Sequence, residues 1–152
     1  MTFEYEFEMA ANTATMVVVN KKTGQVLLGK RKDSSEAFPG AWCLPGGYLN
    51  AGEERLITTA RRELVEECSI DIVEERWNLF YCDDKPGSDP RYKQVINTCF
   101  YAFISDEEAK NAEAGDDLNE IKWVDLWEAR QIELAFAHND VVWEFMLKTP
   151  RD

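Results

Sequence analysis

Metal-binding side chains of the zinc type are scarce in this sequence, which has one histidine, His138, and no Cys-x-x-Cys pair. A structural zinc site usually needs four Cys or His ligands in closely spaced pairs, so zinc binding is not expected. The cysteines are expected to be reduced and mostly buried, as in a cytosolic protein, although a Cys-His nucleophilic pair stays open by count alone. The four cysteines are Cys43, Cys68, Cys82 and Cys99.

Positive charge is also in short supply, with 17 Lys and Arg against 29 Asp and Glu and a net charge of −12. A basic face for nucleic acid is therefore not expected, and an anionic substrate would need a local cation. The sequence has no apolar run long enough to span a membrane, and its first residues lack the charged and apolar regions of a signal peptide. We expect no nucleic-acid partner, no membrane partner and a cytoplasmic location.

Apolar residues, by contrast, are plentiful, since they make up 45% of the 152 residues and include five Trp and eight Phe. This is enough for one sizeable core, so a single domain over residues 1–152 is expected. Strand patterns interleaved with two substantial helices favour an α/β fold, with a mixed β-sheet between helices. Strands are predicted at 3–8, 13–19, 25–31, 70–73, 77–82, 95–104 and 120–124, and helices within 46–70, at 126–132 and at 139–148.

The first ten residues carry a pattern of their own. Phe3, Tyr5 and Phe7 alternate with glutamates, which predicts a strand with one wet face. Residues 1–10 are therefore expected to form either an edge strand of the protein's own sheet or an arm that reaches the second subunit of a homodimer.

An acidic helix is predicted within residues 46–70. Glu63, Glu66 and Glu67 stand at i, i+3 and i+4, so a helix brings the three carboxylates to one side. Like charges repel unless a cation lies among them, and Mg²⁺ prefers such oxygen ligands. Arg62 could hold one carboxylate in place by charge-assisted hydrogen bonds. Taken alone, three glutamates at this spacing are more typical of a solvated helix face.

The stretch from 46 to 70 as a whole resembles the Nudix hydrolase signature, in which a glycine, a short loop and a glutamate precede Arg-Glu-aliphatic-any-Glu-Glu. That core reads Arg-Glu-Leu-Val-Glu-Glu at 62–67. One extra residue separates it from the glycine, so the outer glutamate is either Glu53 or Glu54. A loop tolerates an insertion better than a helix, which favours Glu54. Ser69 stands where the family has the glycine that ends the helix.

The resemblance implies a Nudix-type α/β/α sandwich and a metal-dependent hydrolase of pyrophosphate bonds. The implied cofactor is Mg²⁺, with Mn²⁺ as an alternative, which would neutralise the diphosphate and activate a water molecule. The metal site implied for this sequence comprises Glu63, Glu66, Glu67, Gly47 and Glu54. The catalytic residues are the same three helix glutamates together with Arg62 and Glu120.

Two further segments narrow the resemblance to the ADP-ribose pyrophosphatase-like branch. Ser-Asp-Pro-Arg at 88–91 is similar to a segment of that branch, and so is Leu-Ala-Phe-Ala-His at 134–138. Alone, the Asp-Pro-Arg tripeptide is typical of an ordinary turn. The implied substrate is ADP-ribose, cleaved to AMP and ribose 5-phosphate, and this branch is often dimeric. The residues expected to bind substrate are Gly46, Gly47, Arg31 and Arg91.

The role of Glu120 is left open. It resembles a glutamate near the end of many Nudix domains, which in some members acts as a base or a metal ligand. An exposed charge beside a strand fits the same pattern, and the base could instead lie on the helix or in the pair Asp116-Asp117. Three aromatic residues could either stack on a base or pack in the core: Phe80, Tyr92 and Trp123.

Two other functions stay open as well. One is a Nudix enzyme acting on nucleotide sugars, dinucleotide cofactors or oxidised nucleoside triphosphates. The other is a noncatalytic sensor of ADP-ribose or a nucleotide. Sensors of this kind usually carry a DNA-binding domain, and the sequence has no basic helix for one. The intact core at 62–67 favours catalysis.

Overall fold

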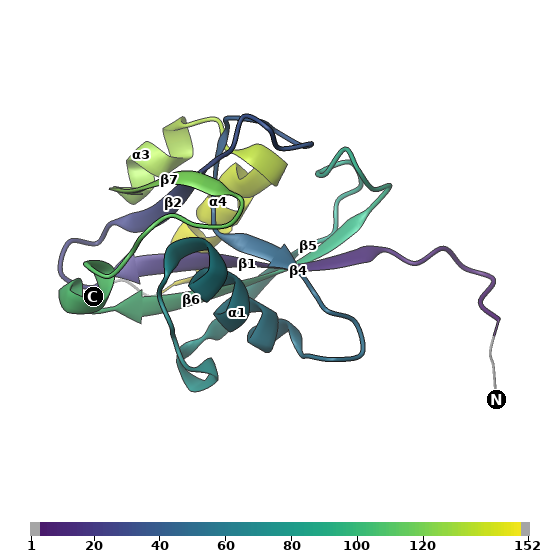
Figure 1. The fold of residues 1–152 in the computed structure, drawn as a ribbon, viewed down its shortest axis with the longest axis horizontal. Coiled ribbons are helices and arrows are strands. Elements are labelled where there is room, and N and C mark those ends of the chain that lie inside the picture. The colour runs from purple at the N-terminus through teal and green to yellow at the C-terminus, as the bar shows by residue number, and fades with distance from the viewer. Residues whose placement is uncertain (1–3, 150–152) are drawn as a thin grey trace.

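A computed structural model of the protein describes residues 4–149, which form a mixed β-sheet flanked by helices (Figure 1). The strands are β1 (Ala11–Asn20), β2 (Val26–Arg31), β3 (Trp42–Cys43), β4 (Gly46–Tyr48), β5 (Asn78–Asp83), β6 (Val95–Ile104) and β7 (Leu118–Val124). The α-helices are α1 (Leu56–Cys68), α2 (Asp106–Ala109), α3 (Leu126–Gln131) and α4 (His138–Lys148), and the 3₁₀ turns are η1 (Glu74–Arg76) and η2 (Ala135–Ala137).

Two long strands at the centre of the sheet organise the fold. β1 and β6 run parallel to each other, while the other strand pairs are antiparallel, and the strand order is β3-β2-β1-β6-β5. β4 also pairs with β1, and β7 pairs with β2. Because successive side chains alternate between faces, Met16 and Val18 enter one core while Val17 and Val19 enter another. Burial on both faces explains why β1 reads as a nearly continuous apolar run.

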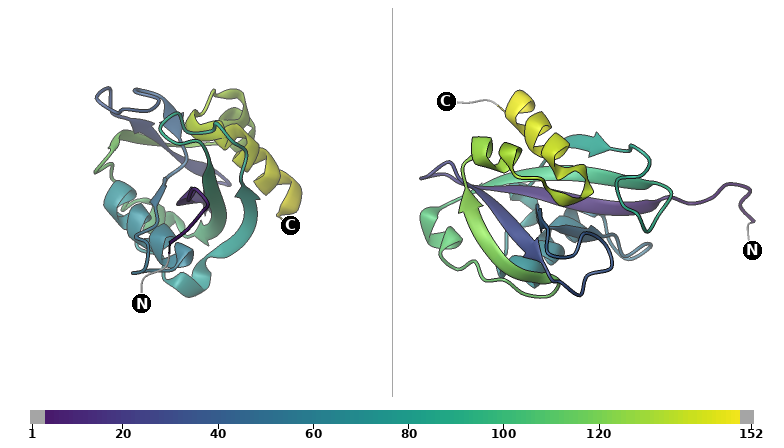
Figure 2. Two further views of the ribbon diagram at one scale, coloured as in Figure 1. Left: turned by 90° about the vertical axis from the view of Figure 1, so that its right-hand side faces the viewer. Right: turned by 90° about the horizontal axis from the view of Figure 1, so that it is seen from above.

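The helices cover opposite faces of the sheet, as the end view in Figure 2 shows for α1 and α4. Ala60 and Leu64 of α1 belong to the core on one side. Val142 and Phe145 of α4 belong to the core on the other side. The predicted α/β/α sandwich with a mixed sheet is thus confirmed. None of the helices in the described part of the chain is long and apolar enough to cross a membrane.

Two predicted strands are wrong. Phe3 lies outside the described residues, and residues 4–10 form no strand but extend away from the body of the protein (Figure 1). Residues 70–73 also form no strand, although Ile70 and Ile72 are buried. The carbonyl of Ile72 accepts a hydrogen bond from the indole of Trp77 at 3.1 Å. This carbonyl is therefore paired with a nearby side chain and not with the backbone of a neighbouring strand. Alternating burial here reflects packing against one core without strand pairing.

Candidate active site

A cavity of about 260 Å³ is lined by β4, α1, the loop that follows β5, the loop that precedes β7 and the start of α4. Its wall combines carboxylates with arginines and rings, which is a suitable composition for a metal–anion complex. The lining includes Gly46, Gly47, Glu63, Glu67, Asp116, Asp117, Arg31, Arg91, Phe136 and His138.

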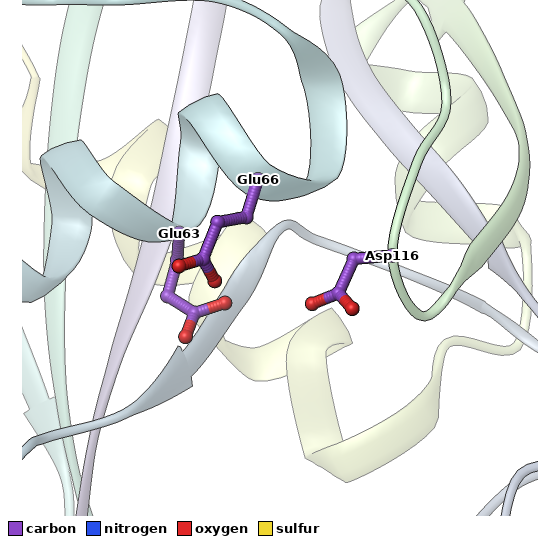
Figure 3. Close-up of side chains that lie close together, drawn as sticks. All are labelled: Glu63, Glu66 and Asp116. Carbon is purple, nitrogen blue, oxygen red and sulfur yellow. The ribbon is translucent and has the colours of Figure 1, made fainter.

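Three carboxylates converge beside this cavity (Figure 3). Glu63 and Glu66 project from α1, and Asp116 projects from the loop before β7. Each offers one ligand atom, and these atoms lie within 4.8 Å of one another. Carboxylate oxygens at this separation fit a hard divalent cation, which takes a few carboxylates and completes its shell with water and phosphate.

Arg62 lies among the acidic side chains and holds them in place. Its Nη1 donates to Oε1 of Glu63 at 2.7 Å and lies 3.3 Å from Oε2 of Glu66. Its Nε and Nη2 donate to both oxygens of Glu54, at 3.1 and 2.7 Å. The guanidinium lowers the pKa of Glu54 to about 2, so this carboxylate stays charged. Glu53 is exposed, and therefore Glu54 is the glutamate that belongs to the network.

The two glycines of β4 allow the carboxylates to approach the backbone closely. A Cβ at Gly47 would overlap the carboxylate of Glu63 and force it to shift, so glycine lets this side chain lie directly against the backbone. The amide of Gly46 donates to Oε1 of Glu67 at 2.9 Å. Glu67 was predicted to share the metal site, but it is not among the three residues of the Glu63–Glu66–Asp116 cluster. It still lines the cavity.

Burial strongly affects the protonation of the helix glutamates. It raises the pKa of Glu63 to about 7, against the opposing effect of Arg62. It also raises the pKa of Glu67, to which the nearby Glu63 and Asp117 contribute. Crowded, desolvated carboxylates favour the neutral form unless a cation joins them. The negative potential of these carboxylates thus favours the binding of a cation.

Next to β4, Asp89 and Tyr48 together hold Arg91 at the cavity, and this pair is called the clamp. The carboxylate of Asp89 accepts two hydrogen bonds from the guanidinium of Arg91, at 3.0 and 2.9 Å, one from the backbone amide of Arg91 at 3.0 Å and one from the hydroxyl of Tyr48 at 2.6 Å. Arg91 also donates to the Tyr48 hydroxyl at 2.7 Å. Asp89 is buried, so the Asp-Pro-Arg segment is not an ordinary exposed turn. It positions the guanidinium of Arg91 at the cavity.

The turn before α4 supplies rings to the same wall. The Arg31 guanidinium lies 4.8 Å from the ring centre of Phe136, and the Arg91 guanidinium lies 5.8 Å from it. Phe136 and Ala137 both adopt left-handed backbone conformations, with φ of 56° and 58°. Such strain in two consecutive non-glycine residues is typical of functional segments. His138 follows directly and is buried.

Several residues singled out from the sequence lie elsewhere. Glu120 was expected in the connection before the last strand, but β7 already begins at Leu118, so Glu120 lies within the strand. It is exposed and does not line the cavity. The connection that faces the signature helix therefore ends with Asp116 and Asp117. None of the three aromatic residues proposed for base stacking lines the cavity either: Phe80, Tyr92 and Trp123.

Phe136 and His138 line the cavity although the sequence did not single them out, and Asp116, expected from sequence only as a possible base, lies in the acidic cluster. The sequence carries a signal for Phe136 and His138, since the segment 134–138 resembles a segment of ADP-ribose pyrophosphatase-like proteins. For Asp116 the signal was weaker, a glycine followed by two acidic residues. Neither pattern indicates which distant residue it will face.

Comparison with known proteins supports the family predicted from the signature. The NUDIX domain model matches residues 10–145. The chain is 32% identical over 126 residues to a protein of Methanocaldococcus jannaschii named ADP-ribose pyrophosphatase, covering 83% of this chain and 68% of that protein. The prediction of the ADP-ribose pyrophosphatase-like branch is consistent with this relative.

Solved structures agree in fold. A MutT/nudix family protein from Enterococcus faecalis superposes with a TM-score of 0.79 at 27% identity, covering 94% of this chain and 63% of that chain. The NUDIX domain of Shewanella oneidensis NrtR, complexed with ADP ribose, gives a TM-score of 0.79 at 23% identity, covering 93% and 89%. This chain thus spans less than two thirds of the Enterococcus chain. Because the family model matches residues 10–145, which is nearly the whole of this chain, the chain belongs to the NUDIX domain family of pyrophosphohydrolases.

Proposed function

We propose that this Nudix protein hydrolyses the diphosphate bond of ADP-ribose, giving AMP and ribose 5-phosphate, with Mg²⁺ as cofactor and Mn²⁺ as a substitute. The observation that carries the proposal is the cluster of Glu63, Glu66 and Asp116 beside a cavity that is also lined by Arg31 and Arg91. A hydrolase of a dianionic diphosphate needs both features, because phosphate charge must be neutralised and held in position.

In this proposal the residues of the chain divide the work. Glu63, Glu66 and Asp116 would hold the cation, and Arg62 orients the carboxylates of Glu63 and Glu66. Glu67 lines the cavity next to this cluster. A divalent cation bound there supplies charge neutralisation for the diphosphate and activation of a water molecule. Gly46 and Gly47 lie in the cavity wall, where backbone without side chains lets a phosphate approach closely.

Arg31 and Arg91 then provide positive charge for the diphosphate of the substrate. Arg91 is held rigidly by Asp89 and Tyr48, so little side-chain entropy is lost when it contacts an anion. Arg31 is fixed in a similar way, since its Nε donates to the carbonyl of Ala37 at 2.8 Å. The preference for ADP-ribose draws on the name of the relative from Methanocaldococcus jannaschii.

We also place the protein in the cytosol and give it a small-molecule nucleotide as its ligand. All four cysteines are unpaired, and Cys43, Cys68 and Cys99 are buried. Cysteines used in this way are typical of reducing compartments.

A substrate panel tests the proposed function. Purified protein is offered ADP-ribose, a GDP-sugar, NADH and an oxidised nucleoside triphosphate at equal concentration, each with Mg²⁺, with Mn²⁺ and with excess chelator. ADP-ribose should be cleaved fastest, AMP should appear, and chelator should stop turnover. Faster cleavage of a triphosphate or a GDP-sugar would reject the substrate, and tight binding of ADP-ribose without cleavage would favour a sensor.

Adjacent glutamates provide a matched pair of variants for the same assay. Glu54→Gln removes the carboxylate that pairs with Arg62, and we expect at least about a tenfold loss in kcat, which corresponds to about 1.4 kcal/mol. Glu53→Gln removes an exposed charge next to it and should change little. Equal effects of both substitutions would show that the Arg62 network does not support catalysis.

A further inference from the structure

His138 has a role that metal binding and diphosphate recognition do not account for. It begins α4, lines the cavity and is only 5% exposed. It is also the only histidine of the protein. A buried polar ring at a ligand cavity has two nitrogens to satisfy, so the partners of both decide what the ring can do.

One nitrogen is committed to the protein backbone. The amide of Leu44 donates to Nδ1 of His138 at 3.0 Å. A backbone amide can only donate, so Nδ1 must be unprotonated, and in the neutral ring the proton must lie on Nε2. Burial, together with the charge of Arg31, lowers the pKa of His138 to about 3. The ring is therefore a neutral Nε2–H donor.

The other nitrogen faces the cavity. Within residues 4–149, Nε2 makes no hydrogen bond to protein. The sole enclosed side-chain nitrogen or oxygen without a partner in that range is Oγ1 of Thr149, so Nε2 keeps accessible surface. Since the side chain is almost fully buried and lines the cavity, that surface belongs to the cavity.

We propose that the Nε2–H of His138 donates a hydrogen bond to an uncharged acceptor of the bound nucleotide and so acts as a specificity-determining residue. The inference rests on the proposed function. Arg31 and Arg91 already provide the positive charge for the diphosphate, whereas the neutral ring adds none. A fixed donor instead selects for a ligand atom that accepts, because a ligand without it leaves the buried N–H unpaired.

Two parts of ADP-ribose offer such an acceptor, namely a ring nitrogen of the base and a hydroxyl oxygen of a ribose. AMP and ribose 5-phosphate separate the two halves of ADP-ribose, because AMP carries the base with its own ribose and ribose 5-phosphate carries the other ribose. AMP binding that depends on His138 while ribose 5-phosphate binding does not places the acceptor in the adenosine half. Dependence of both identifies a ribose hydroxyl.

Nitrogen-15 NMR of the wild-type protein tests the tautomer directly, and the single histidine gives one ring signal pair. At pH 7 we expect a protonated Nε2 and an unprotonated Nδ1, with the Nε2–H signal shifting when AMP, ribose 5-phosphate or ADP-ribose is added. A proton on Nδ1, or an Nε2–H signal that none of these ligands moves although the ligand binds, would overturn the proposal without any variant.

Two substitutions complete the test, with binding measured by calorimetry in the absence of metal. His138→Gln keeps an uncharged donor, and His138→Phe keeps ring volume without one. We expect His138→Phe to weaken binding of at least one probe by about tenfold, as for an unpaired hydrogen-bonding group, and His138→Gln to restore part of the loss. Equal losses in both variants, or binding within twofold of wild type for His138→Phe, would contradict the proposal.

The outcome can be separated from that of the proposed function. Wild-type protein that cleaves ADP-ribose while His138→Phe binds all probes normally overturns this inference alone. Wild-type protein that neither cleaves ADP-ribose with Mg²⁺ nor binds any of the three probes overturns the proposed function and this inference with it. If His138→Phe does not fold because the Leu44 amide loses its acceptor, the wild-type NMR experiment and His138→Gln still decide.

Discussion

Arg62 is the residue on which the arrangement of the acidic cluster depends. It contacts Glu54 through Nε and Nη2 and both Glu63 and Glu66 through Nη1, and its Nη2 also donates to the carbonyl of Tyr48 at 2.9 Å. A planar guanidinium can satisfy several carboxylates at once, whereas lysine offers only a point charge. The cluster is thereby pre-oriented before any cation arrives, which reduces the entropy lost on binding.

Asp116 provides the sharpest single-residue test of the metal site. Asp116→Asn keeps the shape of the side chain and suits the left-handed backbone, since asparagine tolerates the observed φ of 50°. Losing one carboxylate should raise the Mg²⁺ concentration needed for half-maximal rate by at least about tenfold, with part of the rate restored by more metal. The measurement is a Mg²⁺ titration of ADP-ribose hydrolysis.

Glu113→Gln is the matched control, because Glu113 lies in the same connection but is exposed and outside the cavity. An unchanged titration for Asp116→Asn, or the same shift for Glu113→Gln, would remove Asp116 from the metal site. Glu120→Gln belongs in the same series. A folded Glu120→Gln protein that loses at least about tenfold in kcat would support the role predicted from sequence in spite of its exposed position.

At the scale of elements, the loop between β5 and β6 is tied to β4 by the buried Asp89. Asp89→Asn should release Arg91 from its two-point contact and raise the KM for ADP-ribose by about tenfold, in line with the loss of a charge-assisted pair, while kcat changes less. Steady-state kinetics measures both constants. Asp84→Asn, an exposed change in the same loop, serves as control and should behave as wild type.

The result for Asp89→Asn has a clear alternative. If kcat falls as much as kcat/KM while KM is unchanged, the clamp acts in the transition state rather than in binding. If neither constant changes, Arg91 is held well enough by Tyr48 alone and the clamp has no role in substrate binding.

The C-terminus of α1 gives a prediction about stability. Ser69 caps the helix in the left-handed conformation, with φ of 60°, where family members have glycine. Because a Cβ is disfavoured there, Ser69→Gly should raise the free energy of unfolding by about 0.5 kcal/mol, after the greater flexibility of unfolded glycine is subtracted. Urea unfolding measures the change. Ser69→Ala keeps the Cβ and should show no gain, and a destabilised Ser69→Gly would contradict the account.

At the scale of the whole molecule, the described residues leave one apolar segment without cover. Tyr5, Phe7 and Met9 are 77%, 82% and 78% exposed on the segment that extends from β1. Exposed apolar residues gathered in this way are typical of an interaction surface. The predicted homodimer is not tested by a single chain, so it stays a prediction.

Light scattering at micromolar concentration tests the dimer. We expect a mass of about twice 17.5 kDa for wild type and a shift to the monomer for the double substitution Tyr5→Ser and Phe7→Ser, because the stripe loses its apolar area. Leu147→Ser, which removes an exposed apolar side chain on α4, is the control and should leave the mass unchanged. A single 17.5 kDa species for wild type would rule out the dimer.

Strands and helices with strong periodicity were predictable from sequence alone. The predicted 95–104 coincides with β6, and 13–19 and 77–82 match β1 and β5 to within two residues. Burial on one or both faces leaves a local pattern in such elements. The strands at 3–8 and 70–73 were wrong for the same reason, because alternation reports which side chains are apolar but not whether a neighbouring strand is present.

The sequence by itself determined that Glu63, Glu66 and Glu67 lie on one side of a helix, since this follows from spacing within one helix. Only the tertiary structure decided that Asp116 joins two of them and that Glu54 rather than Glu53 pairs with Arg62. It likewise decided that His138 receives the amide of Leu44. These contacts depend on the pairing of β2 with β7 and the packing of α4 on the sheet, and no local pattern encodes how distant segments meet.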